Sequence, residues 1–340
     1  MALEVKMRKI LNLGFYDKYY SGDEFNCIDQ PIAALSDYIK KDNYFYYAFY
    51  STFFTNWYTM NGDKDFIEEK NHILSKFGLN MKRQLIYDSS QFLETITSII
   101  DKDIPVYLLL RRKTLIYDIS DIDSPHGVII CGYDKALKKI LLRDAPHVEQ
   151  SGATYEGYGY GLFNLWLRED LLLEMWEESN KIHHPNMAKC LYYLVQTKEA
   201  KIKNYYDMFS EFTNEYGFKN NMLINFLNSE EYNISEFAND EYSRNFRRWF
   251  ILPKRVIVDI IRRGAIEMNF SKIEELNKIE VNMRLLYSKT INILSLYSKR
   301  GKAITNEKLT NIIADLTEVD NQLQRIVEEI INAYCNNRLN

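Results

Sequence analysis

The sequence lacks the long apolar runs, the excess of one charge and the paired cysteines that mark several common classes of protein. No stretch approaches the roughly 18 consecutive apolar residues of a membrane-spanning helix, and the N-terminus has no apolar core of signal-peptide length. The 43 basic and 47 acidic residues give a net charge of −4, which argues against nucleic-acid binding along the whole surface. We therefore expect a cytoplasmic protein with neither a membrane nor a nucleic acid as partner.

Cysteine is scarce, with residues only at positions 27, 131, 190 and 335 and no repeated spacing. This predicts neither a disulfide framework nor a cysteine zinc site, and His183-His184 lacks the matching ligands of a metal site. We expect reduced thiols, no metal and no cofactor. In contrast, 46% hydrophobic and 14% aromatic residues predict a sizeable core, in one large domain or two ordinary ones.

The segment 26–35, Asn-Cys-Ile-Asp-Gln-Pro-Ile-Ala-Ala-Leu, places a cysteine at the start of an expected helix. Because proline is tolerated only in the first turn, Pro31 requires this helix to begin close to Ile28. Cys27 is then the N-cap or the first helical residue, where the helix dipole and unpaired N–H groups favour the thiolate. Cys27 is either a catalytic nucleophile or a small buried side chain.

Strand-like patterns dominate between residues 104 and 144. The runs 105–111, 114–118, 126–134 and 139–144 have the length and composition of strands in an antiparallel sheet. The turn at 134–137 joins the last two as a hairpin. Counting back from this turn places Asp144 roughly opposite His126 or its neighbour, where the carboxylate can orient the imidazole.

Helical patterns surround these strands and take over beyond about residue 197. The first part is expected to hold helices at 64–76, 89–101 and 164–178 and further strands at 79–87 and 192–195. The aromatic segment 44–58 is expected either to pack in the core or to line an acyl pocket. A glycine-rich loop is expected at 155–161. The second part is expected to hold a helix at 254–268, a long helix opened by a capping box at 271–274 and ended by Gly301, and a last helix capped by Thr305. The sequence thus predicts two domains, 1–197 and 198–340.

Cys27, His126 and Asp144 follow the chain order of the catalytic residues in papain-like enzymes. The segments 26–31, 126–134 (His-Gly-Val-Ile-Ile-Cys-Gly-Tyr-Asp) and 141–144 resemble the C39-like branch of that superfamily, and above all the butirosin biosynthesis protein H group, over about residues 20 to 200. The second segment is fairly specific to that group, whereas the cysteine motif alone is weak. The resemblance implies an α+β, papain-like fold with an antiparallel sheet for residues 1–197, which an all-α helical domain follows.

The same resemblance implies an acyltransferase of antibiotic, nonribosomal peptide-type pathways. It would move an acyl chain from the phosphopantetheine thioester of a carrier protein onto an amine through an acyl-Cys27 intermediate, with His126 as the base and Asp144 as its partner. The oxyanion would be held by the N–H at the helix start and one further donor. Peptidases of the superfamily have a glutamine about six residues before the cysteine, where this chain has Ser21, so the candidates for that donor are Asn26 and Ser21.

Two other functions remain open. A cysteine peptidase or amidase would use the same catalytic residues with water as acceptor, whereas a non-catalytic helical interaction protein would use none of them. The segment 244–263 is rich in arginine and lysine with one acid, which usually means a solvated helix face. Because carrier proteins are acidic, we hypothesise that this segment docks one through complementary charge. The candidate residues are Arg244, Arg247, Arg248 and Arg255. The apolar stripes of the last two helices also leave a homodimer open.

Overall fold

The computed structural model describes residues 7–13, 20, 25–54, 66–115, 124–144, 163–183, 187–197, 199–219, 222–228 and 252–339. The chain divides into two compact units, Met1–Ala48 with Met60–Ala200, and Phe49–Thr59 with Lys201–Asn340. The division after residue 200 lies close to the expected boundary at 197. The second unit also takes in Phe49–Thr59, which the expected boundary left in the first domain, because Phe49 and Phe53 pack against Phe212 with ring centroids 4.9 and 4.5 Å apart.

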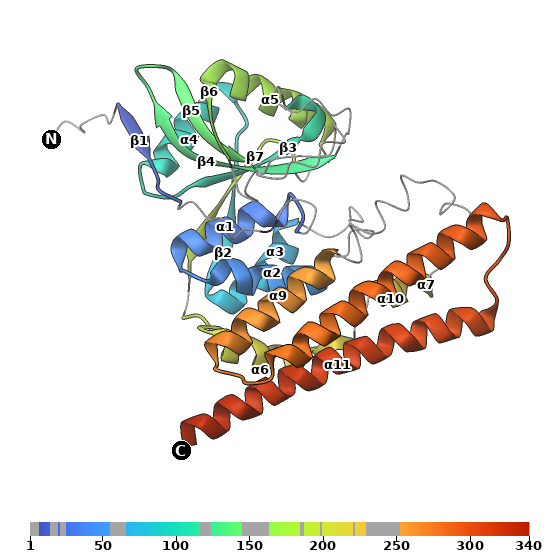
Figure 1. The fold of residues 1–340 in the computed structure, drawn as a ribbon. Helices are drawn as coiled ribbons and strands as arrows, with labels where there is room; N and C mark the ends of the chain where they lie inside the picture. The colour runs from blue at the N-terminus through green and yellow to red at the C-terminus, as the bar shows by residue number, and fades with distance from the viewer. Residues whose placement is uncertain are drawn as a thin grey trace. The chain divides into compact units, whose positions relative to one another are not determined.

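The first unit contains an antiparallel sheet in the order β2-β7-β3-β4-β5-β6, with β1 also paired to β4 (Figure 1). Its strands are β1 (Arg8–Ile10), β2 (Leu79–Leu85), β3 (Val106–Arg111), β4 (Pro125–Asp134), β5 (Lys139–Asp144), β6 (Phe163–Arg168) and β7 (Cys190–Gln196). Strand β4 is buried along almost its whole length, as its continuous apolar run Val-Ile-Ile-Cys requires. The fold is therefore of the α+β class with an antiparallel sheet.

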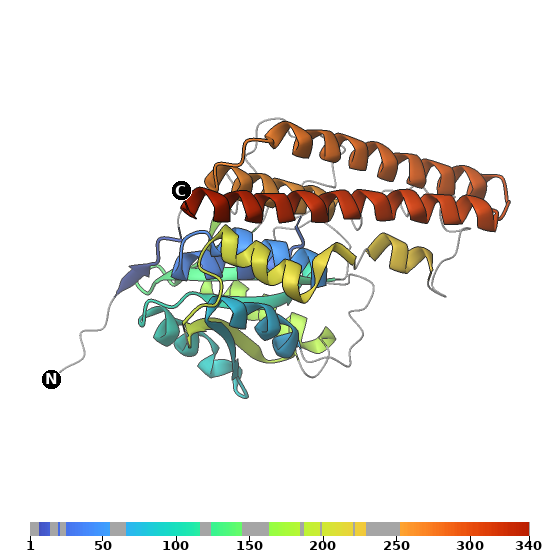
Figure 2. The same cartoon turned by 90° about the horizontal axis from the view of Figure 1, so that it is seen from below.

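Helices cover both faces of this sheet. They are α1 (Asp29–Ile39), α2 (Asn43–Phe54, of which residues 43–48 belong to this unit), α3 (Phe66–Leu74), α4 (Phe92–Ile100) and α5 (Glu169–Ile182). Helix α1 lies against one face, and α4 and α5 lie against the other (Figure 1, Figure 2). The expected helices at 64–76 and 89–101 are thus confirmed as α3 and α4, each with an adjoining 3₁₀ turn.

One local expectation in this unit is wrong, and a second can be compared with the structure only at its first residues. The helix expected over 164–178 begins only at Glu169, because the preceding residues form β6, which pairs with the edge of β5 from Asp144–Phe163 to Lys139–Arg168. Of the strand expected over 114–118, Thr114 lies in a 3₁₀ turn, and residues 116–118 lie outside the described residues. The glycine-rich stretch 155–161 also lies outside them.

The second unit is helical in all of its described regular structure. Its elements are α6 (Tyr205–Glu215), the 3₁₀ turn η4 (Gly217–Lys219), α7 (Met222–Leu227), α9 (Leu252–Glu267), α10 (Ile273–Lys299) and α11 (Asn306–Leu339). Helices α10 and α11 run antiparallel beside each other (Figure 2), which confirms the expected hairpin. Most of their apolar stripes are buried within the chain, although α10 also has the exposed side chains Val281, Leu285 and Leu296; a homodimer stays a prediction.

The ends of these long helices follow the sequence signals in part. Gly301 adopts a left-handed φ of +62° and ends α10, and Thr305 Oγ1 accepts the Lys308 N–H at 3.3 Å at the start of α11. The capping box at 271–274 is wrong, because Lys272 is the N-cap residue and no side chain caps this end. Among the described residues, no helix is long and apolar enough to cross a membrane.

Candidate active site

Cys27 lies in a short turn, residues 26–29, that leads into α1; we call it the Cys27 turn. Ile28 is the N-cap residue, so Cys27 precedes the cap instead of occupying the N-cap or first helical position. Pro31 falls in the first turn of α1, as its missing N–H requires. The side chain of Asn26 supplies the capping, since its Oδ1 accepts the N–H groups of Ile28 at 2.9 Å and Asp29 at 2.7 Å.

His126 and Asp144 form a fully buried pair on adjacent strands. His126 is the second residue of β4, Asp144 is the last residue of β5, and Nε2 of the imidazole lies 2.7 Å from Oδ1 of the carboxylate. Both side chains have 0% of their surface exposed. The expectation that Asp144 lies within side-chain reach of His126 is confirmed.

A β-bulge decides that this contact forms. The β4–β5 register pairs Asp134 with Lys139 and Gly132 with Leu141, and then shifts so that Ile130 pairs with Leu142. Continued without the shift, Asp144 would face Ile129, an odd number of residues from His126 and therefore on the opposite face of the sheet. With the shift, Asp144 faces position 128, two residues from His126 and on the same face.

The Cys27 thiol lies close enough to the same imidazole to raise its pKa. Because Nε2 is taken by Asp144, the ring nitrogen left for sulfur is Nδ1. The start of β4 also holds the Cys27 turn through the backbone, since the Gly127 N–H donates to the Cys27 carbonyl at 3.3 Å, and Cys27 Sγ lies 3.9 Å from the Pro125 carbonyl oxygen. Cys27 is half-buried, whereas the His126 and Asp144 side chains are closed off from solvent, so Cys27 is the least buried residue of the three.

Gly127 permits this close approach of strand and turn. A Cβ at this position would lie 2.7 Å from the ring of Tyr107 and 2.9 Å from the Cys27 carbonyl oxygen, both far inside van der Waals contact. Any side chain here would push β4 away from the Cys27 turn. The close packing of β4 against Tyr107 and the Cys27 backbone therefore requires the glycine next to His126.

The electrostatics of the site keep the imidazole protonated. Burial lowers the pKa of His126, but the charge and hydrogen bond of Asp144, together with the hydrogen bond and charge of Cys27, raise it to about 10. An imidazolium held between a carboxylate and a sulfur stabilises the thiolate, which is the nucleophilic form of cysteine. The arrangement can thus carry out nucleophilic attack on a carbonyl and transfer a proton through His126.

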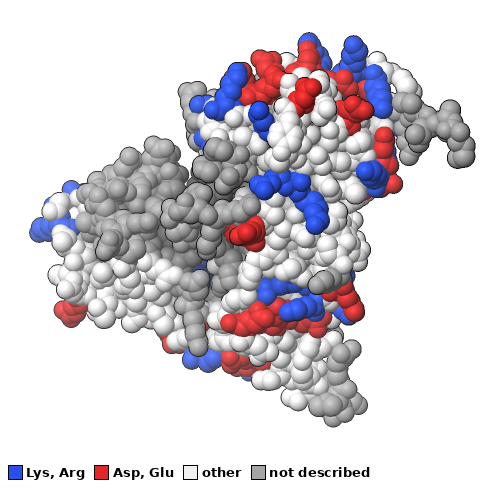
Figure 3. Space-filling model, turned by 180° about the vertical axis from the view of Figure 1, so that it is seen from behind, with Lys and Arg blue, Asp and Glu red and all other residues white. Residues whose placement is uncertain are grey.

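The remaining candidate residues have different positions. Asn26 is buried, and its Nδ2 donates to Asp29 Oδ2 at 2.5 Å, so its role as an oxyanion donor stays a prediction that would need the second amide hydrogen. Arg255 is half-buried on α9 in the second unit. Ser21, Arg244, Arg247 and Arg248 lie outside the described residues. On the face drawn in Figure 3, basic and acidic side chains are intermixed among the described residues.

A second polar group next to Cys27 was not expected from the sequence. The Asp29 carboxylate is bound by Lys70 from α3 at 3.0 Å and by the Tyr47 hydroxyl from α2 at 2.7 Å. A lysine in an amphipathic helix is ordinarily taken for a solvent-facing residue, yet the Lys70 side chain is only 1% exposed. The one available signal was an acid in the first turn after a candidate nucleophile.

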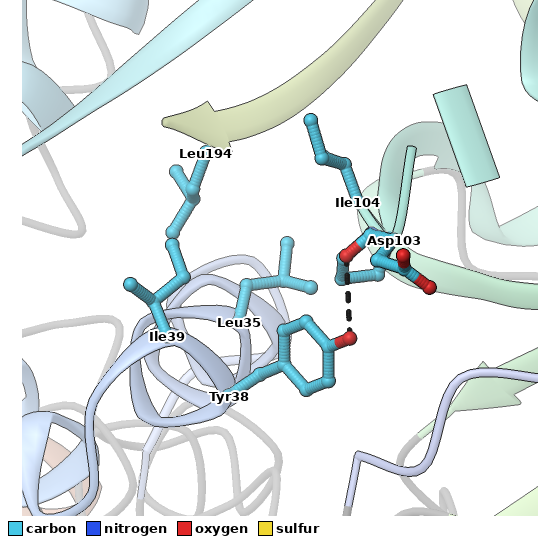
Figure 4. A pocket seen from close by; sticks show the side chains of 7 residues that line it. Leu35, Tyr38, Ile39, Asp103, Ile104 and Leu194 are labelled. Atoms are coloured by element: carbon cyan, nitrogen blue, oxygen red, sulfur yellow. Dashed lines mark hydrogen bonds between the residues drawn. The ribbon is translucent and has the colours of Figure 1, made fainter. Parts of the chain in front are cut away.

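The cavity drawn in Figure 4 lies at the other end of α1 from Cys27. Leu35, Tyr38 and Ile39 line it together with residues 103–105 and Leu194, and the Tyr38 hydroxyl donates to the Asp103 carbonyl at 3.2 Å. Its volume of about 40 Å³ is close to the space of one water molecule. It is too small and too far along the helix to receive an acyl chain bound to Cys27.

Comparison with known proteins adds no further assignment. No protein-family model matches the chain, and no curated protein sequence matches it either. Among the described residues, no three histidine, cysteine, aspartate or glutamate side chains are grouped so that they could hold a metal ion. The interpretation of the site therefore depends on its geometry and chemistry.

Proposed function

We propose that this chain is a papain-like thiol acyltransferase that forms an amide bond through an acyl-Cys27 intermediate. The observation that supports this most directly is that one imidazole interacts with both groups it needs: His126 Nε2 is 2.7 Å from Asp144 Oδ1, and the Cys27 thiol is near enough to the same ring to raise its pKa. The order nucleophile, histidine, acid along the chain and the helix that follows the cysteine agree with this class of enzyme.

In the first half of the proposed reaction, the Cys27 thiolate attacks the carbonyl carbon of an acyl thioester. The tetrahedral oxyanion is held by the Cys27 N–H, which donates to none of the described residues, and by one further donor. The bond between the carbonyl carbon and the departing sulfur breaks, and that sulfur takes the proton from His126. The products are acyl-Cys27 and the free thiol of the carrier.

In the second half, an amine attacks acyl-Cys27 and gives its proton to His126, and the bond between the carbonyl carbon and Cys27 Sγ breaks. The amide leaves and the thiolate–imidazolium pair is restored. Asp144 keeps the ring oriented throughout and stabilises its protonated form. The proposed donor is a carrier protein with a phosphopantetheine thioester, and the proposed acceptor is a small amine such as a diamine.

Intact-mass measurement after incubation with an acyl-loaded carrier protein tests the proposal. We expect one acyl mass on the chain, located at Cys27, which an added diamine removes as an amide. Cys27→Ala should take up no acyl group, whereas Cys335→Ser, which changes a half-buried cysteine of the second unit, should be loaded like the wild type. Hydrolysis of the thioester without amide formation would instead favour a cysteine peptidase or amidase. The absence of any adduct at Cys27 would favour a non-catalytic interaction protein.

Carrier docking on the arginine-rich segment is a separate part of the proposal. If complementary charge brings the acidic carrier to this segment, Arg247→Glu combined with Arg248→Glu should slow loading steeply and make it insensitive to salt. Loading from a small acyl thioester without a carrier should not change. If the carrier loaded this variant as fast as the wild type, docking on this segment would be refuted, but the proposed acyltransferase activity would not.

A further inference from the structure

The Asp29 carboxylate connects four structural elements: the Cys27 turn, α1, α2 and α3. It begins α1, and it accepts hydrogen bonds from Asn26 Nδ2 in the turn at 2.5 Å and from the Tyr47 hydroxyl on α2 at 2.7 Å. Lys70 Nζ on α3 lies 3.0 Å from its Oδ1. Asp29 and Tyr47 are 0% exposed, so these contacts lie inside the first unit.

The buried Asp29 carboxylate has its counter-charge inside the protein, on Lys70. Burial raises the pKa of Asp29, but the charge of Lys70 and the hydrogen bonds from Asn26, Tyr47 and Lys70 outweigh it and lower the pKa, so the carboxylate stays ionised. Lys70 also contacts Glu69 at 2.8 Å. Burial lowers the pKa of Lys70, but the charges and hydrogen bonds of Asp29 and Glu69 raise it, so Lys70 stays charged. A buried ion pair is weak evidence for a purely stabilising role, since well-packed apolar residues of similar volume often serve as well.

Asn26 connects this cluster to the nucleophile. Its amide nitrogen is held by Asp29, and this orients its Oδ1 toward the N–H groups of Ile28 and Asp29. The N–H of Cys27 has no acceptor among the described residues, so it can donate to an oxyanion formed at the carbonyl that the sulfur attacks. If the amide of Asn26 turned away, the Ile28 and Asp29 N–H groups would lose their acceptor and the turn its conformation.

We infer that Lys70, Asp29 and Tyr47 are positioning residues that hold Asn26 and the Cys27 turn in the reactive conformation, with Lys70 balancing the Asp29 charge beside the thiolate. This inference rests on the proposed function only in taking Cys27 as the nucleophile. Among the described residues, the other titratable groups around Cys27 are His126 on β4, Asp144 behind it on β5, and Tyr107 on β3. Burial raises the pKa of Tyr107, and the charges of Asp29 and Cys27 raise it further.

The test is the rate of Cys27 alkylation by iodoacetamide as a function of pH, with the labelled residue identified by mass spectrometry. In Lys70→Met the buried Asp29 charge is no longer balanced, so we expect about a tenfold lower rate at pH 7 and a pH profile shifted upward by about one unit. Combining Lys70→Met with Asp29→Asn removes both charges and keeps an acceptor for the Asn26 amide. This double variant should return the pH profile to that of the wild type.

The matched control is Lys254→Met, which breaks a buried lysine–aspartate pair in the second unit and should leave the alkylation profile unchanged. Wild-type alkylation of folded Lys70→Met, or an equal loss in Lys254→Met, would overturn the inference. If Lys70→Met does not fold, the inference is tested with Tyr47→Phe, which removes the hydrogen bond from Tyr47 to Asp29. A lower alkylation rate in Tyr47→Phe supports the inference, and an unchanged rate overturns it. Because no acyl donor is used, altered alkylation together with absent acyl transfer would refute the proposed function alone.

Discussion

The described residues of the two units contain the same three kinds of interaction, and in the first unit these lie next to Cys27, the proposed nucleophile. Each unit buries a lysine–aspartate pair, Lys70 with Asp29 at 3.0 Å and Lys254 with Asp320 at 2.7 Å. Each presses a glycine against an aromatic ring, Gly127 against Tyr107 and Gly264 against Phe209. Each caps a helix with a side chain, Asn26 for α1 and Thr305 for α11.

This comparison separates what stabilises a fold from what prepares a site. In both units an aromatic ring lies beside the lysine, with the Phe66 ring centroid 5.6 Å from Lys70 Nζ and the Phe53 ring centroid 6.0 Å from Lys254 Nζ, so the aromatic surroundings do not distinguish the two pairs. In the first unit the pair is hydrogen-bonded to Asn26, which caps the Cys27 turn. The same interaction is therefore expected to affect reactivity in one unit and stability in both.

The largest expected effect is on the stability of the second unit. Lys254→Met leaves Asp320 buried without its cation, which should cost about 3–5 kcal/mol, whereas changing Asp320→Leu as well should recover most of that loss. Hydrogen exchange of α9, α10 and α11 measures it. If Cys27 alkylation in this variant fell at a temperature where both units stay folded, the separation between the units would be wrong.

Asp144→Asn tests the buried His126–Asp144 pair of the first unit, which has no counterpart among the described residues of the second unit. Acyl transfer should fall by about 100-fold, a typical contribution of an oriented acid–base group. The pKa of His126, about 10 in the wild type, should fall because Asp144 supplies the main interactions that oppose burial, and NMR titration measures it. Since the folded pKa is raised, the pair's contribution to stability is complete below about pH 6.5 and is lost as the pH rises toward 10. An unchanged His126 titration in Asp144→Asn would contradict the assigned electrostatics.

The two crowded glycines give the next comparison. An added Cβ would lie 2.7 Å from the Tyr107 ring at position 127 and 2.5 Å from the Phe209 ring at position 264. We expect Gly127→Ala and Gly264→Ala each to destabilise their own unit by about 1–3 kcal/mol. Only Gly127→Ala should slow alkylation of Cys27, because it separates β4 from the Cys27 turn; thermal melting and alkylation rates together check this. Equal alkylation in both variants would show that this approach is not needed for reactivity.

The helix caps give the smallest expected effect. Asn26→Ala and Thr305→Ala should each cost about 1 kcal/mol through the lost cap, as seen in denaturant unfolding. Asn26→Ala should also slow alkylation of Cys27, because Asp29 then loses its connection to the turn. Thr305→Ala serves as the control, and a matching loss of reactivity in it would mean that the caps act through general stability.

The sequence alone determined those features that depend on neighbours along the chain. Pro31 confined the start of α1 to the residues just after Cys27, the alternating and apolar runs marked β3, β4 and β5, and Gly301 and Thr305 marked the turn between α10 and α11. Each of these signals acts within a few residues through backbone dihedral preferences, a missing N–H or a side-chain cap.

Only the tertiary structure decided how these pieces meet. The register shift between Ile130 and Gly132 turns Asp144 to the face that carries His126, the edge of β5 makes a strand of residues expected to be helical, and Lys70 is buried because Asp29 faces it. These outcomes depend on hydrogen bonds and burial between residues far apart in sequence. The free energy of such contacts is set by the packed partner, which no local pattern contains.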